Sequence, residues 1–437
     1  MGWGLSELIA KYDVPGAQVA VLADGEIRDE AAGLLSLRTQ VEVTTGSVFK
    51  IGSITKVWTA TLIQQLVSDG LLDLDRPVRD YVPGFRLNGP EATARLTARH
   101  LLTHTGGIDG NHFTDTGLND DAIEKFVATL ADADHLFAPG TVFSYSNSGY
   151  VVLGRLLEIL RGKPFNQVLR EHLVTPWGLS AVATDAYEAI LHRAAVGHVE
   201  SGGKLTPTRN WAIRYFSTPS GSHLAVSARD LLEFARLHLV DLTLAGLREP
   251  QLESVPDFGG GVVGWGLGWM LYRDGVVGHT GVSKGQKAFL RVVPSAGVAM
   301  AVLTNSVSGD QLAHELFSTV LRDLAGVETA SRPVPPANPM PIDADRMCGT
   351  YRTTLYDITL AVENDRAFLS YRPRNQTAES LLGKSRKRVE VVRLSDSAII
   401  TTAPNLDGHQ VLSLIGTDGD GRARFLHNGA AAYRVGR

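Results

Sequence analysis

The hydrophobic positions in the first part of the chain predict a hairpin followed by a buried helix. Residues 5–12 have a helical pattern, and strand-like runs at 17–23 and 27–37 flank Asp24-Gly25. Asp-Gly between two such runs is typical of a tight hairpin turn. From Thr55 to Val67 there is neither glycine nor proline, and apolar residues recur every four positions and spread beyond one stripe. This pattern predicts a helix that is buried over most of its surface.

Strand patterns return after a middle region, about 70 to 260, that mixes helical stretches with loops rich in glycine and proline. The predicted strands are 266–272, 276–280, 287–293 and 298–304. The last two form a hairpin, and the helical stripe that follows ends at Gly326. Because strands from both ends enclose a helix-rich middle, we expect an α/β domain with an antiparallel sheet flanked by helices and a large helical insertion.

The chain changes character after a cluster of prolines between Pro333 and Pro341, which predicts a stiff, extended linker. Beyond it, short apolar or alternating runs such as 358–362 and 411–415 are separated by turn residues. This spacing predicts a small all-β, barrel-like domain of roughly six to eight strands. The expected organisation is an α/β domain over 1–330, a linker over 331–342 and a β-barrel-like domain over 343–437.

Composition and charge disfavour several classes of protein. The chain has 437 residues, of which 44% are hydrophobic and 20% charged, and its formal net charge is −4. This balance argues against a nucleic-acid binder and against a polybasic membrane binder. No apolar run approaches the roughly 18 residues of a membrane-spanning helix. The single cysteine excludes an intrachain disulfide and a cysteine-rich metal site.

Two further features bear on location and metals. The N-terminal residues lack a basic start followed by a long apolar core, so we expect no signal peptide in this chain. The protein is then cytoplasmic, or exported if a signal was removed. The 13 histidines show no metal-ligand spacing of the His-Glu-x-x-His kind, and we expect no metal.

Two Ser-x-x-Lys sequences lie close together, at Ser47 and at Ser53. On a helix, this spacing places the lysine beside the serine hydroxyl, and the helix N-terminus adds positive potential where an oxyanion would form. Ser53 begins the predicted helix, with Lys56 one turn on, whereas the residues after Ser47 are strand-like and Gly52 interrupts any helix there. Ser53 is thus the better candidate nucleophile; the alternative is a helix-capping serine beside a surface lysine.

Two further motifs carry candidate polar groups. Tyr145-Ser146-Asn147 precedes a helical stretch, and a tyrosine near a lysine can share a proton with it. A packed tyrosine and a helix-capping Asn147 are the alternative.

His-Thr-Gly occurs at 104–106 in a turn-rich loop and at 279–281 at the end of a strand. Only the second copy has a strand edge that can offer a backbone N–H to an oxyanion, so we expect the first copy to be structural.

The order of these motifs resembles that of the penicillin-recognising serine enzymes, over about residues 1–326. This superfamily includes class C β-lactamases, D-Ala-D-Ala carboxypeptidases, D-aminopeptidases, family VIII esterases and some transacylases. The resemblance implies that Ser53 is the nucleophile and that Lys56 and Tyr145 transfer protons, without deciding which of the two is the base. It also implies an oxyanion hole made by the N–H groups of Ser53 and Val282. The substrate-binding residues that it implies are Asn147, His279, Thr280 and Gly281.

Two departures from the β-lactamase pattern refine this expectation. His279 stands where β-lactamases usually have lysine, which looks more like carboxypeptidases and D-aminopeptidases and disfavours an efficient β-lactamase. Plain β-lactamases also lack the β-rich C-terminal domain, whereas similar lipocalin-like barrels follow the catalytic domain in some D-peptidases. The sequence Gly281-x-Ser283-x-Gly285 matches the nucleophile elbow of α/β-hydrolases, but a predicted strand follows it where the elbow needs a helix.

We therefore expect a serine acyl-enzyme hydrolase that cleaves an ester or amide of a small molecule or D-peptide through Ser53, with no cofactor. One alternative is a cytoplasmic transacylase that passes the acyl group from an ester donor to an amine without ATP. Another is a weak β-lactamase or a catalytically dead relative that only binds. The expected partners are a small-molecule ester or amide and, for the transacylase, an amine acceptor, with neither nucleic acid nor membrane.

Overall fold

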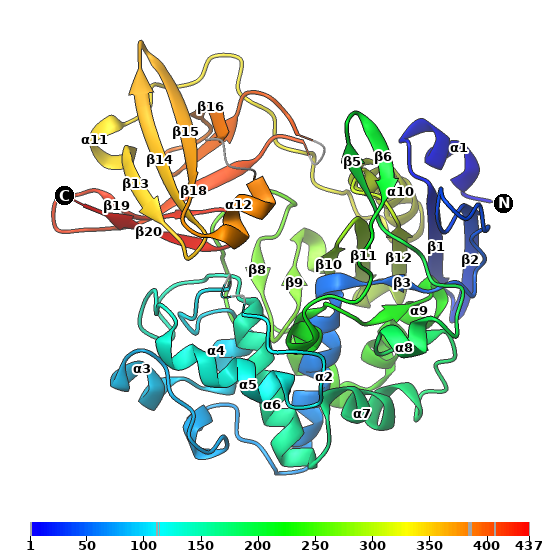
Figure 1. Ribbon diagram of the computed structural model, residues 1–437. Coiled ribbons are helices and arrows are strands. Elements are labelled where there is room, and N and C mark those ends of the chain that lie inside the picture. Colours follow the sequence, from blue (N-terminus) through cyan, green and yellow to red (C-terminus); the bar gives the residue numbers. More distant parts are fainter. Residues whose placement is uncertain (1, 111, 113, 383–386, 406–407, 437) are drawn as a thin grey trace.

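A seven-stranded antiparallel sheet organises the larger domain of the computed structural model, which describes residues 2–110, 112, 114–382, 387–405 and 408–436 (Figure 1). Its strands are β1 (Gly16–Ala23), β2 (Glu26–Gly33), β8 (Gly264–Trp265), β9 (Met270–Leu271), β10 (Val277–Ser283), β11 (Gln286–Val293) and β12 (Val298–Thr304). They lie in the order β2-β1-β12-β11-β10-β9-β8. The N-terminal hairpin therefore pairs with β12, as the sequence pattern predicts for strands that enclose a helical middle.

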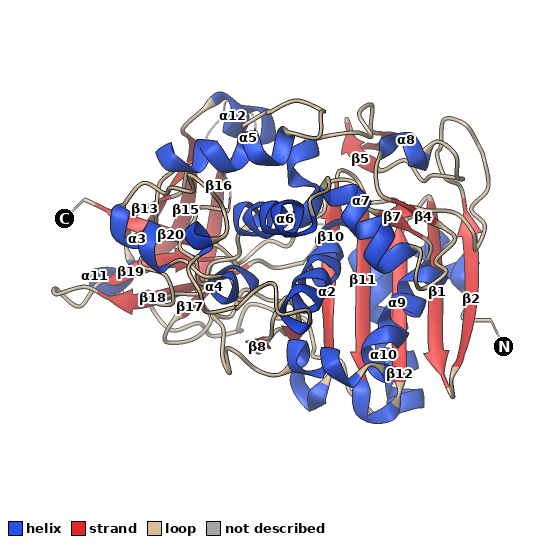
Figure 2. Cartoon of the chain, turned by 90° about the horizontal axis from the view of Figure 1, so that it is seen from below, coloured by secondary structure: helices blue, strands red, loops and turns tan. Residues whose placement is uncertain are grey.

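Helices cover both faces of this sheet. Because successive strand residues point to opposite faces, β12 contributes Ala301 to one core and Val302 to the other. Helix α9 (Ala228–Val240) packs on the first face, and α1 (Leu5–Lys11) and α10 (Gly309–Ala325) pack on the second. Figure 2 shows β10, β11, β12, β1 and β2 side by side, with the helical region next to β10.

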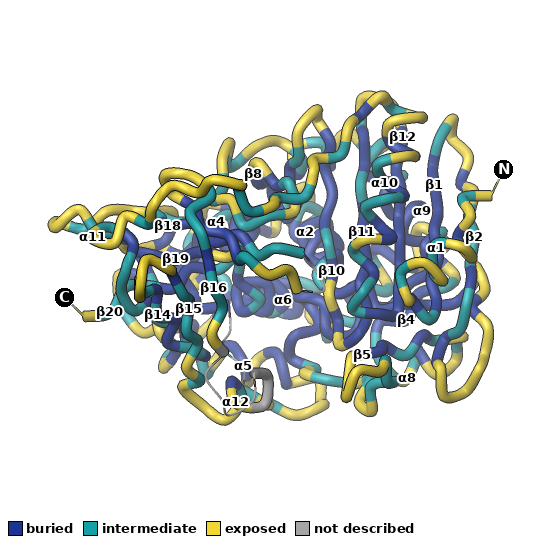
Figure 3. Tube along the Cα trace, turned by 90° about the horizontal axis from the view of Figure 1, so that it is seen from above, coloured by how far each residue is buried: buried dark blue, intermediate teal, exposed yellow. Residues whose placement is uncertain are grey.

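The region between β2 and β8 is the large helical insertion. Its helices are α2 (Thr55–Ser68), α3 (Pro90–Arg95), α4 (Ala98–Leu102), α5 (Ala122–Thr129), α6 (Asn147–Arg161), α7 (Phe165–Leu169) and α8 (Ala186–Ala189), followed by α9. Short strands β3 (Phe49–Lys50), β4 (Val182–Ala183) and β7 (Ala225–Val226) form a small sheet, and β5 (His198–Ser201) and β6 (Lys204–Pro207) form a hairpin. Ten of the fourteen residues of α2 are buried, which confirms the predicted buried helix and is visible in Figure 3.

The C-terminal domain is a closed barrel of eight antiparallel strands. They are β13 (Gly349–Arg352), β14 (Tyr356–Glu363), β15 (Arg366–Pro373), β16 (Lys387–Arg393), β17 (Ala398–Thr401), β18 (Val411–Thr417), β19 (Ala423–His427) and β20 (Ala431–Val435), with α11 (Ala344–Met347) before them and α12 (Gln376–Leu382) after β15. Closure removes the exposed sheet edges. Within the described residues, no helix has the length and apolar character needed to cross a membrane.

One predicted strand is wrong. Residues 266–272 do not form a single strand: residues 266–269 make a turn between β8 and β9, and within the predicted range only Met270–Leu271, which is β9, is a strand. Gly268 has φ 84°, and a Cβ at this position would lie 2.7 Å from the Cβ of Ala60 in α2. The chain can approach α2 this closely only with glycine, so the turn lies against the helix that follows Ser53.

Candidate active site

Ser53 lies in a single 3₁₀ turn, Gly52–Ile54, that leads directly into α2. Lys56 is in the first turn of α2, and its Nζ is 3.1 Å from the Oγ of Ser53. Ser53 is partly exposed, whereas Lys56 is fully buried. The local spacing therefore produces the predicted serine–lysine pair, with the serine on the accessible side.

The contacts of Lys56 suit a neutral amine. Its Nζ donates hydrogen bonds to the Oδ1 of Asn147 at 2.8 Å and to the carbonyl oxygen of Ser220 at 2.7 Å. Burial lowers the pKa of Lys56 well below its ordinary value, because desolvation disfavours the ammonium form. An uncharged amine has two N–H groups for these two oxygens and one lone pair left for the Ser53 hydroxyl. Such an amine can accept the hydroxyl proton.

Tyr145 borders the same pair. The Nζ of Lys56 is 4.8 Å from the centre of the Tyr145 ring. The Tyr145 hydroxyl is buried and has no hydrogen-bond partner among the described residues. Burial raises the pKa of Tyr145, and the nearby Ser53 hydroxyl offsets only part of this rise. The phenol therefore stays protonated and can act as a proton donor.

The second His-Thr-Gly sequence lies on β10, next to this pair. His279 is fully buried, its Nδ1 donates to the carbonyl oxygen of Thr280 at 2.8 Å, and its Nε2 has no partner among the described residues. Burial, with a smaller contribution from Lys56, lowers the pKa of His279 to about 3. The ring is thus neutral, and the positive charge of the usual β-lactamase lysine is absent at this position.

Two glycines allow β10 to approach the serine turn closely. A Cβ at Gly281 would lie 1.8 Å from the carbonyl oxygen of Ile51 and 3.0 Å from the nitrogen of Ser53. A Cβ at Gly52 would lie 2.5 Å from the nitrogen of Val282. The absence of side chains at both glycines therefore allows the backbone of β10 around Val282 to lie directly against the turn that carries Ser53.

The first His-Thr-Gly sequence also reaches the site, which sequence reasoning missed. The ring of His104 packs on Tyr145 with centroids 4.3 Å apart, and the N–H of Ser146 donates to His104 Nδ1 at 3.0 Å. These two contacts place His104 against the ring of Tyr145 and the backbone that follows it. The repeated motif was the signal that could have revealed it, but only the fold brings residues 104 and 145 together.

The rival serines lie in other surroundings. The Oγ of Ser47 accepts a hydrogen bond from the backbone of Thr44 at 2.9 Å, and Lys50 contacts the carbonyl oxygen and ring of Trp211. Ser283 ends β10 and is followed by strand β11. Neither Ser47 nor Ser283 therefore has the lysine, or the strand-to-helix turn, that its sequence motif requires.

The barrel touches the segment that carries Tyr145. The N–H of Tyr145 donates to the carbonyl oxygen of Gly429 at 2.8 Å, and His427 Nε2 contacts the carbonyl oxygen of Phe143 at 3.0 Å. Thr354 donates from its N–H at 2.8 Å and its hydroxyl at 2.5 Å to Oδ2 of Asp109. The C-terminal domain is thus in direct contact with the loops of the candidate site.

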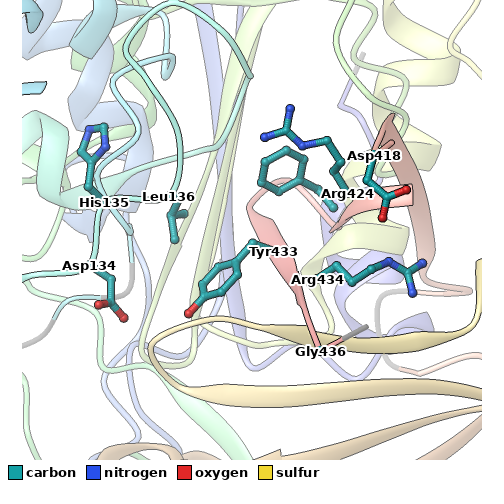
Figure 4. A pocket seen from close by; sticks show the side chains of 9 residues that line it. Asp134, His135, Leu136, Asp418, Arg424, Tyr433, Arg434 and Gly436 are labelled. Atoms are coloured by element: carbon teal, nitrogen blue, oxygen red, sulfur yellow. The ribbon is translucent and has the colours of Figure 1, made fainter. Parts of the chain in front are cut away.

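A polar cavity of about 380 Å³ lies elsewhere on this domain interface (Figure 4). It is lined by the loop 134–136 on one side and by barrel residues such as Asp418, Arg424 and Tyr433 on the other. None of the candidate catalytic residues lines it. No group of three or more His, Cys, Asp or Glu side chains that could hold a metal ion occurs in the described part of the chain.

Comparison with known proteins places the chain in a family. The family model for beta-lactamase matches residues 5–322. The chain belongs to the beta-lactamase family. Members with this fold are serine hydrolases, and a relative named penicillin-binding protein 4, from Amycolatopsis lactamdurans, is 40% identical over 79% of this chain and 94% of its own length.

Solved structures of this beta-lactamase fold differ in how much of the chain they match. The structure of SurE matches 98% of this chain and 97% of its own, with a TM-score of 0.80 and 27% identity. A class C beta-lactamase from Rhodobacter sphaeroides matches 72% of this chain and 97% of its own, with a TM-score of 0.60 and 22% identity. Because the match to SurE covers 98% of this chain, it includes the barrel domain. The class C enzyme leaves more than a quarter of this chain unmatched.

Proposed function

We propose that this protein is a serine acyl-enzyme hydrolase that cleaves an ester or amide of a small molecule or D-peptide through Ser53. The observation that carries the proposal is the position of the buried Lys56 amine, 3.1 Å from the Ser53 hydroxyl and anchored by Asn147 and Ser220. A serine hydroxyl is a weak nucleophile until a nearby base removes its proton. Because burial lowers its pKa, the Lys56 amine can act as that base.

In the proposed acylation step, the Oγ of Ser53 attacks the carbonyl carbon while its proton passes to Lys56. The N–H groups of Ser53 and Val282 stabilise the oxyanion, at the N-terminal end of α2. The buried, protonated Tyr145 hydroxyl then gives a proton to the leaving group and regains one from Lys56. In the second step water attacks the acyl-enzyme while one of its protons passes to Lys56. Lys56 returns this proton to the Oγ of Ser53 as the acid is released. Removal of the serine from such a catalyst costs several orders of magnitude in turnover.

A D-configured substrate is the more specific form of the proposal. The structure of SurE was also solved with D-Leu, and that structure matches 98% of this chain at 27% identity and a TM-score of 0.78. We extend this to the present chain because its neutral His279, in place of the usual lysine, looks more like D-peptidases than like β-lactamases. D-amino acid esters and amides are therefore the first substrates to assay.

Labelling of the intact protein with a fluorophosphonate tests the proposal. We expect one covalent adduct, mapped to Ser53 by mass spectrometry, and none in the Ser53→Ala variant. Ser283→Ala is the matched control, since Ser283 lies on the neighbouring strand β10 and should label and hydrolyse like the original protein. Labelling that persists in Ser53→Ala and disappears in Ser283→Ala would show that the nucleophile is misassigned.

A further inference from the structure

The interior of the barrel is filled at one end and hollow at the other. Alternate residues of each strand point inward, and a buried cluster that includes Tyr351, Leu360, Leu369 and Leu414 fills one end. The other end holds a cavity of about 340 Å³, lined only by residues of the barrel domain. We call this cavity the lumen pocket; its lining includes Ile358, Tyr371, Val389, Leu412, Asn428 and Ala432.

The lumen pocket lies next to the loops of the candidate active site. Two of its lining residues, Asn428 and Ala430, flank Gly429, whose carbonyl oxygen accepts the hydrogen bond from the backbone of Tyr145. Two others, at positions 353 and 355, flank Thr354, which donates to Asp109. Because both contacts to the catalytic domain come from the same end of the barrel, that end faces the site.

The chemistry of the lumen pocket suits an apolar group with one hydrogen-bond acceptor. Aliphatic residues from β14, β18 and β19 form much of its wall. The hydroxyl of Tyr371, also in the lining, is buried without a hydrogen-bond partner among the described residues. A volume of about 340 Å³ is at the small end of the range for ligand sites, roughly 300–1,000 Å³. It can hold one side chain or a short acyl chain.

We propose that the lumen pocket binds an apolar group of the substrate whose carbonyl reacts with Ser53. The proposal deepens the proposed function and rests on it for the reaction, but binding to the pocket can be measured separately. The barrel would then select substrates by their apolar group, while β10 and α2 carry out the chemistry.

Fluorescence of N-phenyl-1-naphthylamine, a neutral aromatic probe, measures occupation of the pocket in the full chain. We expect saturable binding to the original protein and equal binding to Ser53→Ala. Ala432→Phe fills the pocket and should weaken binding at least tenfold, whereas Ala361→Phe, the same change on the outward-facing alternation of β14, should not. Val389→Phe, at a half-buried lining position, replaces Ala432→Phe if that variant does not fold. If the probe binds with undiminished affinity to a folded Ala432→Phe or Val389→Phe protein, the proposal is wrong.

Hydrolysis of esters with acyl chains of increasing length links the pocket to the substrate. We expect kcat/KM to rise with chain length in the original protein and in Ala361→Phe, and to become independent of length in Ala432→Phe. A chain-length dependence that survives in Ala432→Phe overturns the proposal even if the probe binds in the lumen. If Ser53 labels but length has no effect in any variant, the pocket proposal is wrong and the proposed function stands; if Ser53 does not label, the proposed function fails.

Discussion

The barrel hairpin that holds the Tyr145 segment offers a sharp test of how the two domains cooperate. His427 is fully buried, and burial lowers its pKa to about 4, so its ring is neutral at pH 7. Its Nε2–H donates to the carbonyl oxygen of Phe143 at 3.0 Å, and its Nδ1 accepts from the N–H of Gly429 at 3.2 Å. The carbonyl oxygen of Gly429 in turn accepts from Tyr145 at 2.8 Å. His427→Leu removes the first two of these bonds and leaves the third without support.

The expected effect has two parts. Leu cannot pair with the buried oxygen of Phe143 or the N–H of Gly429, and each unsatisfied group costs about 1–3 kcal/mol. The free energy of unfolding should fall by about 2–6 kcal/mol in total, if both groups remain buried. A displacement of Tyr145 by about 1 Å would lower turnover by on the order of 10²-fold. We therefore expect a lower Tm together with a lower kcat and a nearly unchanged KM for a small ester.

The assay compares kcat, KM and Tm for His427→Leu, His427→Gln and His409→Leu. Gln can restore one of the two hydrogen bonds and should recover part of kcat, which a purely steric effect would not produce. His409 lies in the barrel and bonds to Thr401 within that domain, so its replacement should leave kcat unchanged. A folded His427→Leu protein with the kcat of the original would refute a positioning role for the hairpin.

Three further outcomes are expected. Four buried histidines have pKa values lowered from 6.5 to about 3 or about 4: His223, His238, His279 and His427. Between about pH 6.5 and pH 4 these histidines are protonated in the unfolded chain but not in the folded one, so Tm should fall as the pH decreases through this range. Glu158, whose pKa is raised to about 7, has the opposite effect but is a single group. A Tm at pH 4.5 as high as at pH 7 would contradict this expectation. Gly281→Ala should lower kcat by on the order of 10²-fold or more, because its Cβ would lie 1.8 Å from the Ile51 carbonyl oxygen, whereas Gly246→Ala, with no atom within 4 Å, should be neutral by steady-state kinetics. With an activated ester and rising amine, chromatography should find only the acid; saturable amide formation would instead support the transacylase alternative.

Local patterns were sufficient for the parts of this protein that depend on neighbouring residues. The four-residue apolar recurrence over 55–67 corresponds to α2 (Thr55–Ser68), and alternating runs after the prolines correspond to the closed eight-stranded barrel. The contact between Ser53 and Lys56 also follows from sequence, because residues three apart on a helix share a face. The error at 266–272 arose where a local pattern competed with a long-range contact: the approach of Gly268 to Ala60 has no signature in either segment alone.

The tertiary structure decided what these residues can do. Asn147 and Ser220 are 91 and 164 positions from Lys56, yet both accept hydrogen bonds from its amine. The lowered pKa of Lys56 depends on burial by several elements, which no spacing rule encodes. The hydrogen bond from Tyr145 to Gly429 likewise has no signature in the sequence, because it forms only when the barrel docks on the catalytic domain. Sequence could name the candidate reacting groups because they form ordered motifs, but the charge states of these groups and the contacts that hold them depend on packing between segments that are far apart in the chain.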